Sequence, residues 1–105
     1  MAAEAAQMLA EKLVRTPLVQ IPADLVPAGP AALFLKLECC QLSGSFKARG
    51  ATHFIERLIQ QQVPDGVLTY SSGNHGRAVA EVAARRGIPA LVVAPETIDP
   101  VKAQA

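Results

Sequence analysis

The spacing of hydrophobic residues predicts three complete helices. In residues 2–14 they recur every three or four positions among alanine and glutamate, which is the period of an amphipathic helix. The same period runs from Phe46 to Ile59, and Ser45 before it is the predicted N-cap. A third stretch, residues 78–87, places its apolar side chains on one face and closes at a glycine. These three segments supply the helices of the predicted fold.

Shorter apolar runs between these helices predict strands. An extended piece at residues 18–21 leads into a loop over residues 22–30, and the largely apolar residues 33–37 are predicted to form a buried strand. Two more strands are predicted at residues 67–70 and 90–94. An Asp-Pro pair near the end of the chain then begins a fourth helix, which the chain leaves unfinished.

The order of these elements predicts the fold class. Strands that alternate with helices are typical of a parallel α/β architecture with right-handed crossovers. Parallel sheets need helices on both faces, so we expect a three-layer α/β/α arrangement. Because the chain supplies only three or four strands, we expect this fold to be incomplete at the C-terminus, as in the first part of a longer protein.

Composition narrows the class of protein. Half of the 105 residues are hydrophobic and 18% are charged, which suits a packed core and at most one domain. Ten Lys and Arg against nine Asp and Glu leave a net charge of +1, so no basic field attracts nucleic acid or an anionic membrane. No apolar run approaches the roughly 18 residues of a membrane helix, and the start lacks the apolar region of a secretory signal. We therefore expect a cytoplasmic protein that binds neither nucleic acid nor membrane.

The two cysteines, Cys39 and Cys40, are neighbours in the sequence. A disulfide between adjacent residues departs strongly from the usual bridge geometry, so none is expected. Two adjacent thiols also lack the spacing of a zinc site, and the chain has no further cysteine to complete one. We therefore predict small buried or half-buried thiols and no metal site.

The segment from Ser43 to Ala51, Ser-Gly-Ser-Phe-Lys-Ala-Arg-Gly-Ala, is the first with candidate chemistry. It places Lys47 in the first turn of a predicted helix. The positive end of the helix macrodipole disfavours an ammonium there and favours the neutral amine, which is the form that attacks an aldehyde. A solvated surface lysine has the same position, so this segment alone leaves both interpretations open.

The second segment, Ser71 to Gly76, lies between a predicted strand and a predicted helix. Exposed backbone N–H groups and the helix dipole favour an anion at such a turn, either a carboxylate or a phosphate. The segment matches neither the dinucleotide pattern G-x-G-x-x-G nor the phosphate loop G-x-x-x-x-G-K-[ST]. An ordinary turn capped by serine or asparagine is the alternative interpretation.

Taken together and in this order, the segments resemble the fold-type II pyridoxal-phosphate enzymes, in the branch of serine/threonine dehydratases and serine racemase. The resemblance runs nearly from end to end, over Arg15-Thr16-Pro17-Leu18, Leu35-Lys36-Leu37-Glu38 with Gln41, Ser43 to Ala51, Ser71 to Gly76 and Val92-Val93-Ala94-Pro95. It implies a tryptophan synthase β-like fold. Residues 1–65 would form the N-terminal part of the large domain, and residues 66–105 would begin the small domain.

Two details of the motifs distinguish branches within this superfamily. Cysteine synthases usually follow the lysine with Asp-Arg and the asparagine with Thr, whereas this chain has Ala48-Arg49 and His75 at those places. The resemblance therefore points to hydroxyamino-acid chemistry. Threonine dehydratases commonly carry Ser-Ala-Gly-Asn-His, whereas Ser72 gives this chain the Ser-Ser-Gly-Asn-His of serine racemase.

The resemblance implies a cofactor site for pyridoxal 5'-phosphate. Lys47 resembles the lysine that forms the internal aldimine and later exchanges the α-proton of the substrate. Phe46 resembles the residue that packs against the cofactor ring, and Asn74 resembles the one that hydrogen-bonds its phenolic oxygen.

A substrate site for an amino acid is implied as well. Ser71, Ser72, Asn74 and His75 look like the residues that bind the substrate, with Ser71, Asn74 and His75 cradling its carboxylate. Ser72 resembles the second acid/base group, opposite Lys47 across the cofactor plane. One base suffices for elimination to a keto acid and ammonia, whereas two bases on opposite faces also permit racemisation. Both outcomes stay open.

The activity implied by the resemblance is that of a serine/threonine ammonia-lyase or serine racemase acting on β-hydroxy amino acids, as a homodimer when full length. The family's glycine-rich phosphate loop, its residue facing the pyridine nitrogen and its acidic metal ligands belong beyond Ala105, so we expect the 105 residues alone to be inactive. Arg77 departs from the family, which often has Gln there. The alternative is a non-catalytic remnant that folds only with a partner.

Overall fold

The computed structural model describes residues 2–26 and 32–104. Its elements run in the order α1 (Ala2–Leu9), β1 (Leu18–Gln20), η1 (Ala23–Leu25), β2 (Phe34–Lys36), η2 (Glu38–Cys40), η3 (Leu42–Gly44), α2 (Lys47–Gln61), β3 (Val67–Tyr70), α3 (Asn74–Arg85), β4 (Ala90–Val93) and α4 (Pro100–Ala103), where η marks a single 3₁₀ turn. The second and third helices and the last two strands lie where the sequence predicts them.

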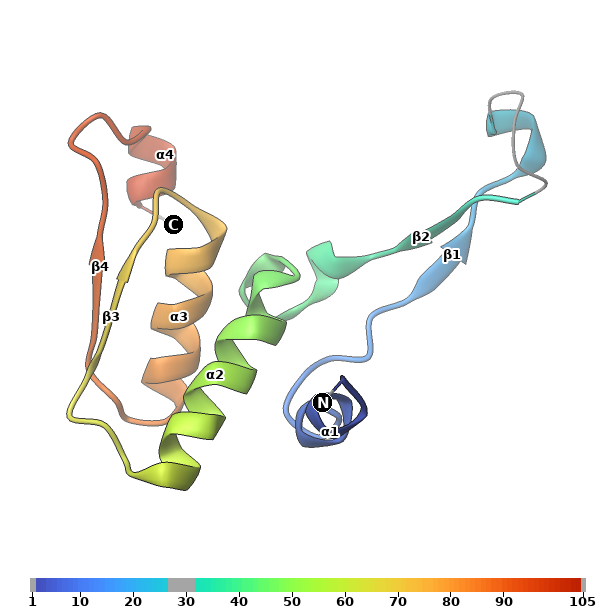
Figure 1. The fold of residues 1–105 in the computed structure, drawn as a ribbon. Helices are drawn as coiled ribbons and strands as arrows, with labels where there is room; N and C mark the ends of the chain where they lie inside the picture. Colours follow the sequence, from blue (N-terminus) through green and yellow to red (C-terminus); the bar gives the residue numbers. More distant parts are fainter. Residues whose placement is uncertain (1, 27–31, 105) are drawn as a thin grey trace.

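The core forms where α2 packs against α3 and α3 packs against one face of the parallel strands β3 and β4 (Figure 1). Ala51 and Ile55 of α2 and Ala78 and Ala83 of α3 are buried at this contact. Alanine side chains let the two helix backbones approach closely, and Ile55 fills the space between them. The alternating pattern of β3 turns Thr69 toward the helices, so the predicted parallel α/β architecture is confirmed.

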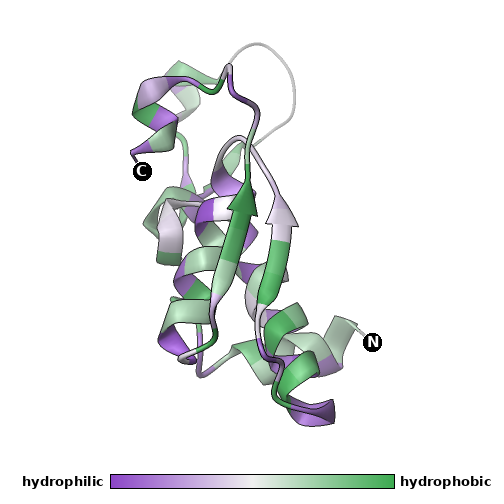
Figure 2. Ribbon diagram, turned by 90° about the vertical axis from the view of Figure 1, so that its left-hand side faces the viewer, coloured by the Kyte–Doolittle hydropathy of each residue, from purple (hydrophilic) through white to green (hydrophobic). Residues whose placement is uncertain are grey.

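The opposite face of the sheet is apolar and exposed. Leu68 and Tyr70 of β3 pair in register with Leu91 and Val93 of β4, and Leu68 is 70% exposed. Figure 2 looks onto this face and shows that both strands carry hydrophobic residues. Among the residues that the structure describes, helices cover one side of the sheet, and the second helical layer of the predicted three-layer arrangement does not occur there.

The strand predicted at residues 33–37 forms, but its predicted burial is wrong. β2 pairs antiparallel with β1 in a two-stranded ribbon that projects from the helices as an arm (Figure 1). Phe34 is 52% exposed and Leu35 45% exposed. An apolar run predicts burial only where another layer covers it, and both faces of this ribbon are open within the described part of the chain. The predicted loop at 22–30 lies partly outside the described residues.

Two other expectations need correction near the N-terminus. α1 ends at Leu9, whereas residues 2–14 were expected to be helical, because the backbone continues in tight turns such as Lys12 N–H to Leu9 C=O. Cys39 and Cys40 are exposed, whereas buried or half-buried thiols were expected. The two cysteines lie on the outer side of η2, whereas Glu38 of the same turn and Gln41 after it make the inward contacts.

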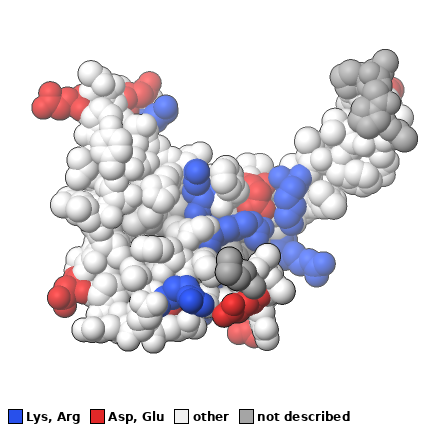
Figure 3. Space-filling view, viewed as in Figure 1, with Lys and Arg blue, Asp and Glu red and all other residues white. Residues whose placement is uncertain are grey.

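Charged side chains on the face drawn in Figure 3 gather where the arm joins the helices, with basic and acidic groups side by side. A separate buried carboxylate, that of Glu56 on α2, binds side chains that follow α3 and α1, because Arg86 Nε donates to it at 2.7 Å and Lys12 Nζ lies 3.5 Å away. Among residues 2–26 and 32–104, no helix combines the length and apolarity needed to cross a membrane.

Gly76 in the first turn of α3 sets how closely this helix approaches the sheet. A Cβ atom there would lie 2.7 Å from Val92 Cγ1 and 3.1 Å from Ser71 Cβ. We expect Gly76→Ala to lower the free energy of unfolding of the full-length protein by about 1–3 kcal/mol, the usual cost of overpacking. Chemical denaturation measures this change.

Gly50, the fourth residue of α2, provides the matched control, because a Cβ atom there meets nothing within 4 Å. Gly50→Ala is expected to raise stability by up to about 1 kcal/mol through helix propensity. Adding Val92→Ala to Gly76→Ala is expected to recover part of the loss. Equal stability of Gly76→Ala and the wild type would contradict the close approach.

Candidate active site

A sharp reversal of the chain just before α2 determines the direction in which this helix begins. The buried Gln41 side chain fastens this reversal, because its Oε1 accepts from the N–H groups of Val14 and Leu42 at 3.0 Å each and its Nε2 donates to the Val14 carbonyl at 2.8 Å. Ser43 and Gly44 follow with positive φ angles of 60° and 72°. Two successive left-handed residues reverse the chain within one turn, and only for glycine is this conformation free of steric cost.

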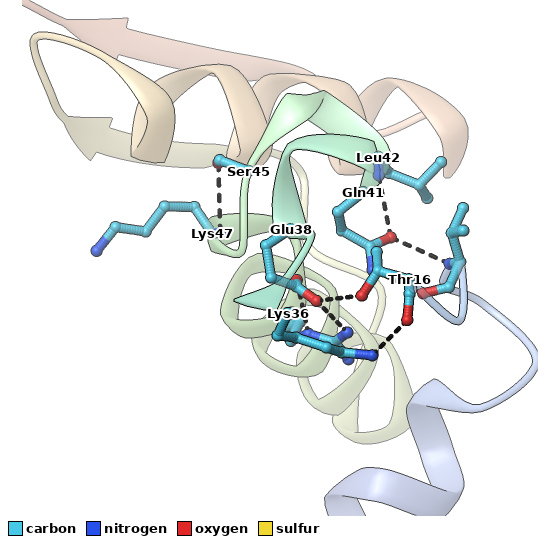
Figure 4. A network of polar contacts seen from close by, with 9 residues as sticks. Thr16, Lys36, Glu38, Gln41, Leu42, Ser45 and Lys47 are labelled. Carbon is cyan, nitrogen blue, oxygen red and sulfur yellow. Dashed lines mark hydrogen bonds and ion pairs between the residues drawn. The ribbon is translucent and has the colours of Figure 1, made fainter. Parts of the chain in front are cut away.

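A second anchor joins the segment after β2 to the first turns of α2 (Figure 4). Arg49 donates from Nε to Glu38 Oε2 at 2.9 Å and from Nη2 to Glu38 Oε1 at 2.7 Å, which is the bidentate geometry of a guanidinium and a carboxylate. Thr16 Oγ1 also donates to Glu38 Oε1 at 2.6 Å, and Lys36 Nζ donates to the Thr16 carbonyl at 2.6 Å. The Glu38 carboxylate therefore joins the segment before β1 to the start of α2.

The hydrogen bonds from Arg49 lower the pKa of Glu38 to about 2, and the Thr16 hydroxyl and the charges of Arg49 and Lys36 act in the same direction against the opposing effect of burial. Glu38 is therefore ionised throughout the neutral range. The same ion pair raises the pKa of Arg49. These groups position the start of α2.

Lys47 lies in the first turn of α2, as predicted, and its side chain extends away from the Glu38 anchor (Figure 4). Its Nζ lies 4.8 Å from the centroid of the Phe46 ring. The helix begins one residue later than predicted, with Phe46 and not Ser45 at the N-cap position. The Ser45 hydroxyl still accepts from the Lys47 backbone N–H at 3.4 Å, because Ser45 has the extended backbone of a capping residue.

A cavity of about 510 Å³ opens beside Lys47, within the roughly 300–1,000 Å³ of typical ligand sites. Lys47 and Phe54 of α2 line it together with Phe46, which precedes the helix. Thr69 of β3 and His75 of α3 line the opposite part, with mainly aliphatic residues between them. The start of α2 and the β3–α3 unit therefore bring one amine, one imidazole and two aromatic rings to the same space. Phe46, Lys47 and His75 are three of the six predicted site residues.

Thr69 is a site residue that the sequence analysis did not identify. Its Oγ1 lies 2.9 Å from His75 Nε2, and the two atoms share a hydrogen bond whose direction depends on the tautomer of the imidazole. The signal in the sequence is a single polar residue at an inward position of the strand Val67–Tyr70. The sequence analysis named Glu38 and Arg49 only as parts of motifs. Their contact spans 11 residues and follows neither the helix nor the strand period, so the spacing of residues does not predict it.

The other predicted site residues lie elsewhere on the turn between β3 and α3. Ser71 and Asn74 line a second cavity of about 600 Å³, together with Arg77 and residues from β4 and α4. The Ser71 hydroxyl is engaged within the turn, because Gly73 N–H donates to it at 3.2 Å. Ser72 is exposed and lines neither of these two cavities. The structure thus brings His75 to Lys47 and leaves Ser71, Ser72 and Asn74 on other faces of the turn.

Comparison with known proteins gives a consistent family assignment. Residues 9–105 match the sequence model of the family described as "Pyridoxal-phosphate dependent enzyme". A serine racemase of Oryza sativa subsp. indica is 52% identical over 63 residues, which are 60% of this chain and 19% of the relative. A catabolic L-threonine dehydratase, TdcB, of Staphylococcus aureus is 42% identical over 91 residues, which are 87% of this chain and 26% of the relative.

Solved structures agree with these sequence matches. The structure of maize serine racemase is similar with a TM-score of 0.85 and 42% identity, and a pyridoxal 5'-phosphate-dependent aspartate racemase with a TM-score of 0.87 and 34% identity. Each match covers 97% of this chain, and 31% and 32% of the respective solved chains. The chain thus spans about a fifth to a third of the length of the relatives it matches. These neighbours confirm the predicted tryptophan synthase β-like fold. The chain therefore belongs to the family of pyridoxal-phosphate-dependent enzymes, in the fold-type II branch that contains serine racemases and threonine dehydratases.

Proposed function

We propose that the complete protein is a racemase or ammonia-lyase that acts on serine, threonine or a related β-hydroxy amino acid, with Lys47 as its cofactor-binding lysine. The observation that carries the proposal is the cavity shared by Lys47 and His75. The similarity of the chain to a serine racemase and a threonine dehydratase supports this substrate class. A cytoplasmic location, homodimeric assembly and the division into domains at residues 65 and 66 belong to the same proposal.

The residues beside the cavity suit pyridoxal phosphate. Lys47 forms no ion pair within residues 2–26 and 32–104, so no carboxylate competes for its amine. The Phe46 ring next to it offers an apolar face to a flat heterocycle. Lys47 would hold the cofactor through its aldehyde, and Phe46 would hold it through the ring. When bound, the cofactor supplies the electron sink that stabilises negative charge at the substrate α-carbon.

His75 and the start of α3 form the proposed substrate side. The hydrogen bond with Thr69 fixes the imidazole at the wall of the cavity, and the N-terminus of a 12-residue helix favours the carboxylate of an amino acid. Lys47 Nζ would take the proton from the substrate α-carbon on one face. The Ser72 hydroxyl would return a proton to the same carbon on the opposite face when the reaction is a racemisation.

The test uses the full-length protein with pyridoxal phosphate. We expect borohydride reduction to attach the cofactor to the peptide that contains Lys47, and chiral analysis of L-serine reactions to detect D-serine, pyruvate or both. The same assay with L-threonine separates the two substrates. A label on another lysine, or no label and no turnover, would contradict the proposal and favour a non-catalytic protein.

Ser72→Ala separates racemisation from elimination. We expect this change to reduce D-serine formation by about 10²-fold or more, the usual contribution of one acid/base group, and to leave ammonia release within roughly tenfold of the wild type. Thr97→Ala removes an exposed hydroxyl before α4 and serves as the matched control. Undiminished racemisation by Ser72→Ala would exclude the proposed role of Ser72.

A further inference from the structure

Cys39 and Cys40 form an exposed pair of thiols at the surface turn η2. Their Sγ atoms lie 4.0 Å apart and share a weak hydrogen bond. This contact with Cys39 raises the pKa of the Cys40 thiol, and the charge of Cys39 acts in the same direction. The two sulfurs are in contact, although no disulfide joins them.

The separation of the two sulfurs matches the bite of a chelate. Two sulfurs that each lie about 2.3 Å from one ion can be at most roughly 4.6 Å apart, so sulfurs 4.0 Å apart can bind the same ion. Residues 2–26 and 32–104 contain no cluster of three or more His, Cys, Asp and Glu side chains around a common point, so no third protein donor completes a zinc site here. The pair therefore suits an ion or molecule that needs only two sulfur ligands. Soft thiolate ligands preferentially bind soft, thiophilic partners.

We propose that Cys39 and Cys40 are a two-sulfur chelating site for a thiophilic ion of the class that includes Cu(I) and trivalent arsenicals. With an organic arsenic(III) oxide, two As–S bonds form, the As–O double bond breaks, and the oxygen leaves as water with the two thiol protons. No atom changes its oxidation state. Nothing in the proposed amino-acid chemistry uses these thiols, so the site is independent of it.

Chelation at this turn acts on the anchors of α2. Glu38, which receives both hydrogen bonds from Arg49, is the residue before the pair, and Gln41, which holds the chain reversal, is the residue after it. Closing a ring through the two sulfurs constrains the backbone between Glu38 and Gln41. We expect this constraint to alter the orientation of Lys47, a consequence that rests on the proposed function.

Phenylarsine oxide is the probe for the site, applied to the full-length protein and to three variants, Cys39→Ser, Cys40→Ser and the double substitution. Relative to the double variant, the wild type is expected to bind one arsenical per chain and to lose two titratable thiols. Each single variant is expected to bind at least 100-fold more weakly. A dithiol such as 2,3-dimercaptopropanol, but not an equal concentration of thiol groups as 2-mercaptoethanol, is expected to release the arsenical.

Equal affinity of the wild type and a single variant, or two arsenicals per chain, would overturn the site. Mass spectrometry of digested wild type locates the arsenical on the peptide with both cysteines, so this readout does not depend on the folding of any variant. A second readout is borohydride labelling of Lys47, which we expect the arsenical to slow at least threefold in the wild type and not in Cys39→Ser. Stoichiometric binding with unchanged labelling would refute the coupling alone, whereas absent labelling without arsenical would refute the proposed function.

Discussion

Lys47→Ala will remove borohydride-dependent labelling by pyridoxal phosphate and reduce amino-acid turnover by roughly 10³-fold or more, because the substitution deletes both the covalent attachment point and the α-carbon base. Lys47→Arg is expected to be equally inactive. It retains a positive charge at the start of α2 but has no amine able to attack an aldehyde. The full-length protein with serine as substrate is the system for both measurements.

Lys12→Ala is the matched control for this prediction. Lys12 Nζ pairs with Glu56 at 3.5 Å at a partly exposed position, and such pairs contribute about 1 kcal/mol or less to stability. Labelling and turnover of Lys12→Ala are expected to stay within twofold of the wild type. A labelled Lys47→Ala protein would place the cofactor on another lysine and exclude the cavity beside Phe46 as its site.

Glu38→Gln will make the protein less stable at neutral pH and less sensitive to acid. At neutral pH we expect a loss of about 2 kcal/mol in the free energy of unfolding, since hydrogen bonds to a charged group contribute about 1.5–3 kcal/mol. The pKa of Glu38 is about 2 in the folded protein against an ordinary value of 4.5. The unfolded chain therefore binds more protons in this interval, and the contribution of Glu38 decreases as the pH falls from 4.5 to 2.

Denaturant unfolding at several pH values between 2 and 6 tests this dependence. The difference in unfolding free energy between wild type and Glu38→Gln is expected to be constant above pH 4.5 and to shrink below it, by at most about 1.4 kcal/mol per pH unit for one proton. Glu81→Gln is the control, because Glu81 forms an exposed helical pair with Arg85 that contributes about 0.3–0.5 kcal/mol. A difference that does not vary with pH would contradict the Arg49 anchor.

The sequence correctly predicts those parts of the fold in which hydrophobic residues recur at a regular spacing. α2 and α3 bury the faces on which their apolar residues recur, and β3 turns its alternate side chains to those helices. The burial of Phe34 and Leu35 was predicted wrongly because hydropathy reports what a side chain favours and not which layer is present to cover it. The length of α1 was overestimated because none of its residues is buried, and an isolated short helix is marginal without packing.

The candidate site was predictable in its residues but not in their arrangement. The motifs identify Lys47 and His75, and the fold brings both to one cavity. They do not indicate that Ser71 and Asn74 line another cavity. Asn74 and His75 are neighbours on a helix and point in directions about 100° apart, and Ser71 precedes that helix. Nor do they indicate that Arg49, two residues after the lysine, turns back to Glu38.

The uncovered face of the β3–β4 sheet has a colloidal consequence. One surface of this sheet carries four large exposed side chains, those of Leu68, Tyr70, Leu91 and Val93. The outer edge of β3 also has free backbone donors and acceptors within the described part of the chain. Such a surface adheres to its own copies, by contact between apolar faces and by strand addition at the edge. At high concentration, these 105 residues by themselves would therefore aggregate, and detergents that cover apolar surfaces would keep them in solution.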